Sequence, residues 1–151
     1  MAIQYDKLYE GQGKKTFTLA CGMFSTTSIY FKDAALLVKV EAEGEVFFYD
    51  ATGELQASCT LERQDRRYNE VICEIKDGKV LLEFTLYKYV DNYPHCDGEH
   101  DRWDEIRIGA LPVCYDLEQK TATVNAFKLL NAVVVRKKAC YPFGQHAFYV
   151  V

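Results

Sequence analysis

The amino-acid sequence predicts a mainly β protein, an antiparallel β-sandwich or a barrel-like meander with at most one short helix. Two observations support this prediction. Short segments in which apolar and polar residues alternate follow one another from residue 35 to residue 90, separated by tight turns. The 151 residues also include 11 Tyr and 9 Phe, and aromatic side chains are favoured on the pleated surface of a sheet. Many short strands at this spacing are typical of sandwiches and barrels.

Residues 1–151 are expected to form a single β-rich domain, because their number is ordinary for one domain and no linker, internal repeat or low-complexity segment divides them. The first 13 residues are polar and contain two glycines, so we expect a lead-in without regular structure. Strands are then expected over 14–23, 28–31 and 35–42. In the last of these, Leu36, Val38 and Val40 share one face, as in a half-buried strand.

The centre of the chain carries the clearest turn signals. Asp50 to Gly53 has the Asp-first, Gly-last order of a four-residue turn, and it separates expected strands over 45–49 and 55–61. Asp77-Gly78 joins two alternating runs, which predicts a tight β-hairpin. Alternation also places Cys59 and Cys73 on apolar strand faces, where a thiol behaves as a small hydrophobic group.

The second strand of that hairpin, over 79–90, has two apolar faces. One face carries four aliphatic or aromatic residues, Val80, Leu82, Phe84 and Leu86. The other carries Leu81, Thr85, Tyr87 and Tyr89. If the first set packs in the core, the second set needs cover from the protein's own chain, from a second subunit or from a ligand. The sequence leaves these three possibilities open.

The C-terminal third is harder to assign. Residues 105–115 resemble a strand that is broken at Gly109 and Pro112, and Pro112 favours an edge, a bulge or a strand end. Residues 121–124 alternate weakly. We expect a helical turn near Ala126–Leu130, where apolar spacing fits a helix, then a strand to residue 138 and a final strand over 146–151.

Charge and composition narrow the function classes. The net charge is −4, and the segment from Asp91 to Glu105 alone holds six carboxylates against one arginine. The rest of the chain is therefore close to neutral, and the acidic segment would repel nucleic acid. No apolar run is long enough for a membrane span, and the N-terminus does not resemble a signal peptide. We therefore expect a cytoplasmic protein with free thiols and no cofactor.

The acidic segment, which also contains the only tryptophan, is our first candidate for a partner-binding surface. A tryptophan supplies buried area, and carboxylates steer a loop toward a basic partner. The predicted partner-binding residues, which include the second face of the hairpin strand, are Asp97, Glu99, Asp101, Trp103, Asp104, Tyr87 and Tyr89. The partner is expected to be another protein, without nucleic acid or membrane.

Two alternatives use other residues. Basic residues in two separate stretches could together hold a nucleotide or another phosphorylated small molecule, and these are Arg63, Arg66, Arg67, Arg136 and Lys137. The side chains of His95, Cys96 and His100 are weak candidates for a metal-dependent enzyme site. However, no C-x-x-C pair accompanies them, and the surrounding carboxylates would raise the pKa of a nucleophilic thiol.

The sequence therefore favours a small non-catalytic binding protein that acts by docking on a protein or by sequestering a ligand. This chain is similar in size, charge and lack of catalytic motifs to many inhibitors, immunity proteins and phage counter-defence proteins. This is an analogy between kinds of protein. The aromatic second face and the apolar C-terminus also favour a homo-oligomer.

Overall fold

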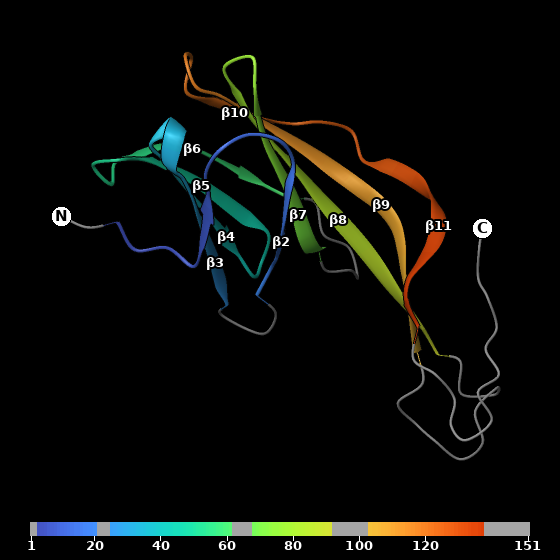
Figure 1. The fold of residues 1–151 in the computed structure, drawn as a ribbon. Helices are drawn as coiled ribbons and strands as arrows, with labels where there is room; N and C mark the ends of the chain where they lie inside the picture. The colour runs from blue at the N-terminus through green and yellow to red at the C-terminus, as the bar shows by residue number, and fades with distance from the viewer. Residues whose placement is uncertain (1–2, 21–24, 62–67, 92–102, 138–151) are drawn as a thin grey trace.

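The computed structural model describes residues 3–20, 25–61, 68–91 and 103–137, and these form two β-sheets that pack face to face (Figure 1). The predicted fold class is confirmed: the protein is mainly β, its two sheets do not close into a barrel, and the described residues contain one short 3-10 turn, η1 (Lys32–Ala34). The predicted strand over 146–151 lies outside the described residues.

The first sheet, sheet A, has five strands in the order β1 (Lys7–Tyr9), β3 (Thr26–Phe31), β4 (Leu36–Glu41), β5 (Glu45–Asp50) and β6 (Leu55–Thr60). The second sheet, sheet B, has the order β10 (Thr121–Val124), β9 (Trp103–Asp116), β8 (Lys79–Asp91), β7 (Tyr68–Lys76) and β2 (Lys15–Thr18), and its sixth strand, β11 (Lys128–Lys137), also pairs with β9.

The core lies between the sheets and follows the alternation of the sequence. Leu36, Val38 and Val40 of β4 share one buried cluster with Val80, Leu82 and Phe84 of β8, as the alternation predicts, and Leu86 is also buried. The ring of Phe48 stacks on that of Tyr115 across the sheets, with centroids 4.7 Å apart. Burial of such rings supplies much of the hydrophobic stabilisation of a sandwich.

Both predicted turns are present. Lys76 pairs with Lys79, and Asp77 and Gly78 between them have φ angles of 52° and 73°, as a two-residue hairpin turn requires. The backbone N–H of Gly53 donates to the carbonyl oxygen of Asp50 at 3.0 Å, which closes the second turn.

The prediction that residues 1–13 lack regular structure is wrong, because Lys7–Tyr9 form strand β1. Tyr9 is fully buried and lies against Phe31, with ring centroids 5.1 Å apart. This strand runs parallel to β3, whereas the other pairings are antiparallel. The chain crosses from β1 in sheet A to β2 in sheet B and returns to β3, which allows parallel pairing without a hairpin.

The helical turn predicted near Ala126–Leu130 is also wrong. Strand β11 begins at Lys128 and pairs with β9, Lys128 lying opposite Ala110. Pairing with the free edge of β9, together with the β-branched run at 133–135, outweighs the helical spacing of the apolar residues.

Gly109 and Pro112 do not break strand β9, which continues from Trp103 to Asp116. The register with β8 shifts between Leu86 and Tyr87, so the predicted irregularity is a bulge next to Gly109. A Cβ atom on Gly109 would overlap the ring of Phe127. The Pro112 carbonyl accepts from the N–H of Asn125, so the missing N–H of Pro112 faces the connection between β10 and β11, where no ladder hydrogen bond is lost.

Strands β8, β9 and β11 continue beyond the end of β7, whose first residue, Tyr68, pairs with Leu86. Residues 87–91, 103–107 and 133–137 therefore form a three-stranded extension, which we call the arm (Figure 1). Asp91 pairs with Trp103 at its end, so the chain between them is the connection of a long hairpin.

Replacing Phe48 by Ala should lower the free energy of unfolding by about 3–5 kcal/mol, because the side chain is fully buried in the core. Phe47 is the matched control, since it has the same chemistry on the outer face of the same strand. Urea unfolding of the two variants measures the difference. Equal losses for Phe47→Ala and Phe48→Ala would contradict the assignment of the two faces of β5.

Candidate functional site

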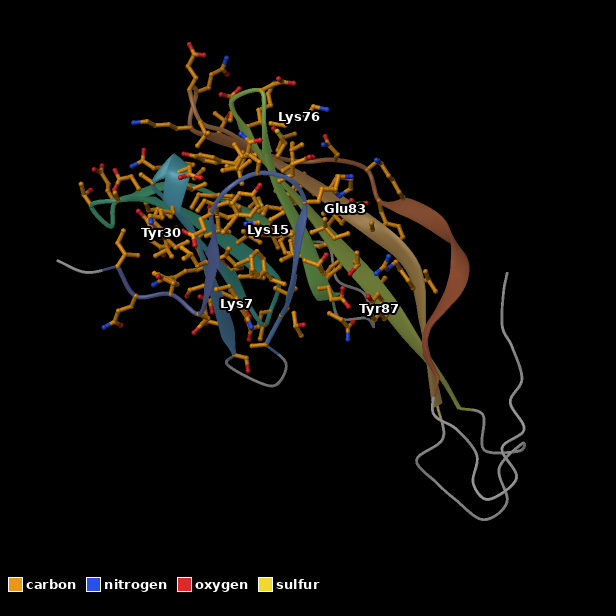
Figure 2. All side chains as sticks on the ribbon, in the orientation of Figure 1. Lys7, Lys15, Tyr30, Lys76, Glu83 and Tyr87 are labelled. Carbon is orange, nitrogen blue, oxygen red and sulfur yellow. The ribbon has the colours of Figure 1, made fainter. Side chains whose placement is uncertain are left out.

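The outer face of sheet A, opposite the core, carries a continuous line of apolar side chains. Register places five residues side by side, one on each strand, and we call them the apolar row: Leu8, Tyr30, Leu37, Tyr49 and Leu55. At a strand spacing of about 4.8 Å, the row is about 19 Å long. Figure 2 shows Tyr30 on the side of the molecule formed by sheet A, away from Tyr87 of sheet B.

Strand alternation produces this row. Ile29 and Phe31 are fully buried in the core, so Tyr30 between them points outward. Phe48 fixes the outward direction of Tyr49 in the same way. Leu55 is 50% exposed, and Leu37 is 9% exposed because larger side chains flank it on both neighbouring strands.

The aromatic rings of the row already have neighbours. Tyr5, which is 44% exposed, stacks on Tyr30 with a centroid distance of 5.6 Å. The ammonium of Lys39 lies 5.2 Å from the centroid of Tyr49, and Phe47 lies 6.4 Å from the same ring. One face of each tyrosine is thus covered by the protein itself. A base or sugar ring would find these faces partly occupied, whereas ring edges and aliphatic groups remain available to a protein surface.

Carboxylates surround the row at both ends of the strands. Among the residues that the structure describes, they include Glu41, Glu43 and Glu45 at the β4–β5 turn and Glu10, Asp33 and Glu54 at the opposite end. Three described lysines belong to sheet A or its connections: Lys7 on β1, Lys32, which lies 3.5 Å from the carboxylate of Glu10, and Lys39. The described rim of the face is therefore acidic.

The β5–β6 turn that presents Leu55 is held by Asp50. The carboxylate of Asp50 accepts hydrogen bonds from the backbone N–H of Thr52 at 2.9 Å and of Glu54 at 3.0 Å, and from the Thr52 hydroxyl at 2.6 Å. The hydroxyl bond of Thr52 and the backbone bond of Glu54 hold the pKa of Asp50 below its usual range.

The outer face of sheet B is more polar and contains a network that spans three strands. The hydroxyl of Tyr87 on β8 donates to Glu70 on β7 at 2.6 Å and accepts from Arg107 on β9 at 3.0 Å. The guanidinium of Arg107 also lies over the Tyr87 ring, 5.5 Å from its centroid. Burial, and then the bond to Glu70, raises the pKa of Tyr87, so its hydroxyl stays protonated and serves as a structural donor.

Beside this network lies a shallow depression of about 190 Å³. Apolar residues of three strands form its floor, including Ile72, Leu81 and Pro112, and it is bordered by Lys14, Lys128, Glu74 and Glu83. Two lysines and two glutamates border it, so it offers no concentrated charge of either sign. Because it is shallow, it would enclose little of a small ligand.

The sequence-predicted site residues are placed as follows. Tyr87 is 5% exposed, so its side chain offers little surface to a partner in this structure. Tyr89, Trp103 and Asp104 lie on the arm strands β8 and β9, and Arg136 and Lys137 lie on β11. The predicted residues outside the described part of the chain are Asp97, Glu99, Asp101, Arg63, Arg66, Arg67, His95, Cys96 and His100.

Strand pairing places the predicted basic residues of β11 beside the end of the acidic segment. Arg136 lies opposite Glu105 and Lys137 opposite Asp104 in the β11–β9 register. Tyr89 lies on the other side of Glu105. Arg136 and Lys137 were predicted to form an anion site together with the arginines of the 63–67 turn. On the backbone, however, their cross-strand neighbours are residues that carry carboxylates.

The thiols that the structure describes, Cys59, Cys73 and Cys114, are free. Burial raises the pKa of Cys59 to about 11 and raises that of Cys73 further, so neither thiol forms a nucleophilic thiolate near neutral pH. In the described ranges there is no group of three or more His, Cys, Asp or Glu side chains that could hold a metal ion.

The alternation of apolar and polar residues did not by itself reveal the apolar row. Tyr30 and Leu37 each lie inside a short run of large apolar residues, Ile29–Phe31 and Leu36–Val38. Apolar residues on both faces of these strands were the sequence signal that could have indicated an apolar outer surface. The register that aligns these residues depends on strand order, which the sequence does not show.

Comparisons with protein-family models, curated proteins and solved structures gave no match to this chain. No helix among the described residues is long and apolar enough to cross a membrane.

Replacing Tyr87 by Phe should lower the free energy of unfolding by about 1 kcal/mol at neutral pH, since Glu70 and Arg107 lose their shared hydrogen-bond partner. The pKa of Tyr87 in the folded protein is raised above its ordinary value of 10.0, so folding favours the protonated form. Its contribution is complete below pH 10 and is lost as the pH rises through the folded pKa.

Wild-type protein should therefore lose stability more steeply above pH 10 than Tyr87→Phe, as measured by urea unfolding from pH 8 to 11.5. Tyr115, whose pKa burial also raises, contributes equally to both proteins and serves as an internal background. An identical alkaline decline in the two proteins would show that Tyr87 is not held in this network.

Proposed function

We propose that this chain is a non-catalytic binding protein that docks on another protein through the outer face of sheet A. The apolar row is the observation that carries the proposal, because it aligns one apolar side chain on each of five paired strands. Tyrosine is enriched among the residues that dominate binding energy at protein interfaces. A paired sheet also holds such residues rigidly, which reduces the entropy lost on binding.

The row suits a protein better than a small molecule. Its two tyrosines are each covered on one face by Tyr5 or Lys39, and aliphatic Leu37 lies between them. Four strands of six residues and one of three make a face of at most about 19 by 20 Å, roughly half of what one partner contributes to a standard interface. The contact is therefore small and reversible, or it extends onto a second surface.

The acidic segment on the arm is the second surface that we propose. Because Asp91 pairs with Trp103, the segment joins two strands that run beyond the sandwich, away from the core. Its predicted residues Asp97, Glu99, Asp101 and Trp103 would steer and anchor a basic partner. Inhibition of the bound protein is one activity that such docking would serve.

The two alternatives receive less support. An anion site that uses Arg136 and Lys137 has the carboxylate-bearing residues Glu105 and Asp104 as cross-strand neighbours on the backbone. The metal site predicted at His95, Cys96 and His100 lies outside the described residues and stays a prediction.

The two docking surfaces can be tested separately by recovery of bound proteins from a lysate of the source cells, quantified by mass spectrometry. The face variant is Tyr49→Ser with Leu55→Ser, and the arm variant is Trp103→Ala with Asp97→Asn and Glu99→Asn. Loss of two interface anchors should reduce recovery of a specific partner by at least about tenfold in the face variant. Thermal unfolding confirms that each variant folds.

The matched control is Ile72→Ser with Leu81→Ser, which makes the same kind of change on the outer face of sheet B. Full recovery of the same partner by the face variant, or equal loss in the control, would rule out docking through sheet A. If only the arm variant loses recovery of the partner, the acidic segment and not sheet A is the docking surface.

A further inference from the structure

We propose that the partner of the apolar row is a basic protein segment, one that combines apolar side chains with Lys or Arg. This inference rests on the proposed docking function and adds the chemistry of the partner. It follows from the charged residues around the row, because the apolar residues alone do not indicate the charge of the partner.

The carboxylates nearest to the row on one side are those of the β4–β5 turn. Glu41 and Glu45 point to the same face as Leu37 and Tyr49, because each is an even number of residues away on the same strand. Glu41 is held in place by the Thr26 hydroxyl, which donates to its carboxylate at 2.6 Å. Glu43 and Glu45 are exposed. A partner that covers the row therefore meets a preformed anionic border.

Lys39 does not neutralise this border. It lies on β4 between Leu37 and Glu41, and its ammonium is 5.2 Å from the centroid of Tyr49, on the side of the apolar row. The described lysine at the other end, Lys32, is paired with Glu10 at 3.5 Å. The described carboxylates at the β4–β5 turn therefore remain available to cations from outside.

The spacing also sets a minimum size for the partner. Glu41 is four residues from Leu37, which corresponds to about 14 Å along a strand. A segment that contacts both the row and the carboxylates must span that length, which takes about nine residues of helix or about four of extended chain. A single basic side chain or a small cation is too short.

The same charges disfavour two other occupants. A second copy of the chain would bring the described carboxylates of one rim against those of the other, which opposes association. Single-stranded nucleic acid would bring phosphates to that rim, and one face of each tyrosine in the row is already covered. Both occupants are outcomes of the test below.

The probe is a 14-residue amphipathic peptide of Leu and Lys, compared with the peptide of the same pattern in which Glu replaces Lys. Binding to the full chain is measured by fluorescence anisotropy. We expect the Leu/Lys peptide to bind and the Leu/Glu peptide not to bind. Glu41→Gln with Glu45→Gln should raise the Kd about threefold to tenfold, and added salt should weaken wild-type binding.

One control separates this site from other acidic surfaces. Glu74→Gln with Glu83→Gln removes the same charge from the outer face of sheet B and should not change the Kd by more than about twofold. An equal effect from this control, or equal binding of the Leu/Glu peptide, would overturn the inference.

The remaining outcomes identify the other occupants. Binding of a thymidine 12-mer that is lost in Tyr49→Ser with Leu55→Ser would show that the row binds nucleic acid and not a basic segment. A dimer in sedimentation equilibrium that is lost in the same variant would show that the row binds a second copy of the chain. If the face variant loses its lysate partner while Glu41→Gln with Glu45→Gln keeps it, the proposed docking through sheet A is supported, but the inference that the partner is basic is wrong. If both variants keep the partner, docking through sheet A fails as well.

Discussion

The packing of sheet A on sheet B, centred on the stacked rings of Phe48 and Tyr115, is the constraint on which the other features depend. Once Phe48 points into the core, neighbouring residues of β5 must point away from it, because successive side chains of a strand alternate. Tyr49 and Phe47 are outward-facing for this reason and for no local preference of their own. The inner packing thus determines which residues a partner can contact.

The register between strands then converts outward-facing residues into a surface. Tyr30, Leu37 and Tyr49 are far apart in the sequence but lie side by side, since two antiparallel hairpins align them. The turn held by Asp50 adds Leu55 at the edge. On sheet B, by contrast, the corresponding face is occupied by hydrogen bonds among Glu70, Tyr87 and Arg107, which join strands to one another. The two faces therefore differ in use: one remains available for contact and the other mainly stabilises the sheet.

Alternation and turn chemistry made much of the fold predictable, including the mainly β class, the Asp77-Gly78 hairpin and the core faces of β4 and β8. They failed where pairing between distant strands decides the structure. Tyr9 enters the core only because β1 pairs with β3, and Lys128 lies in a strand because β9 has a free edge. The apolar row was missed for the same reason. Tyr87 was predicted as a contact residue from its outward position, but Arg107 and Glu70, which engage its hydroxyl, come from other strands.

The most direct test of this account is nitration of the native protein by tetranitromethane, with the modified tyrosines located by mass spectrometry. The account predicts rapid nitration of Tyr5, Tyr30 and Tyr49 on the outer face of sheet A, and strong protection of Tyr9 and Tyr115, which are 0% and 2% exposed. Addition of a docked partner should then protect Tyr30 and Tyr49 selectively. Nitration of Tyr9 and Tyr115 at the rate of Tyr49 would contradict the inward and outward assignment, and with it the proposed docking face.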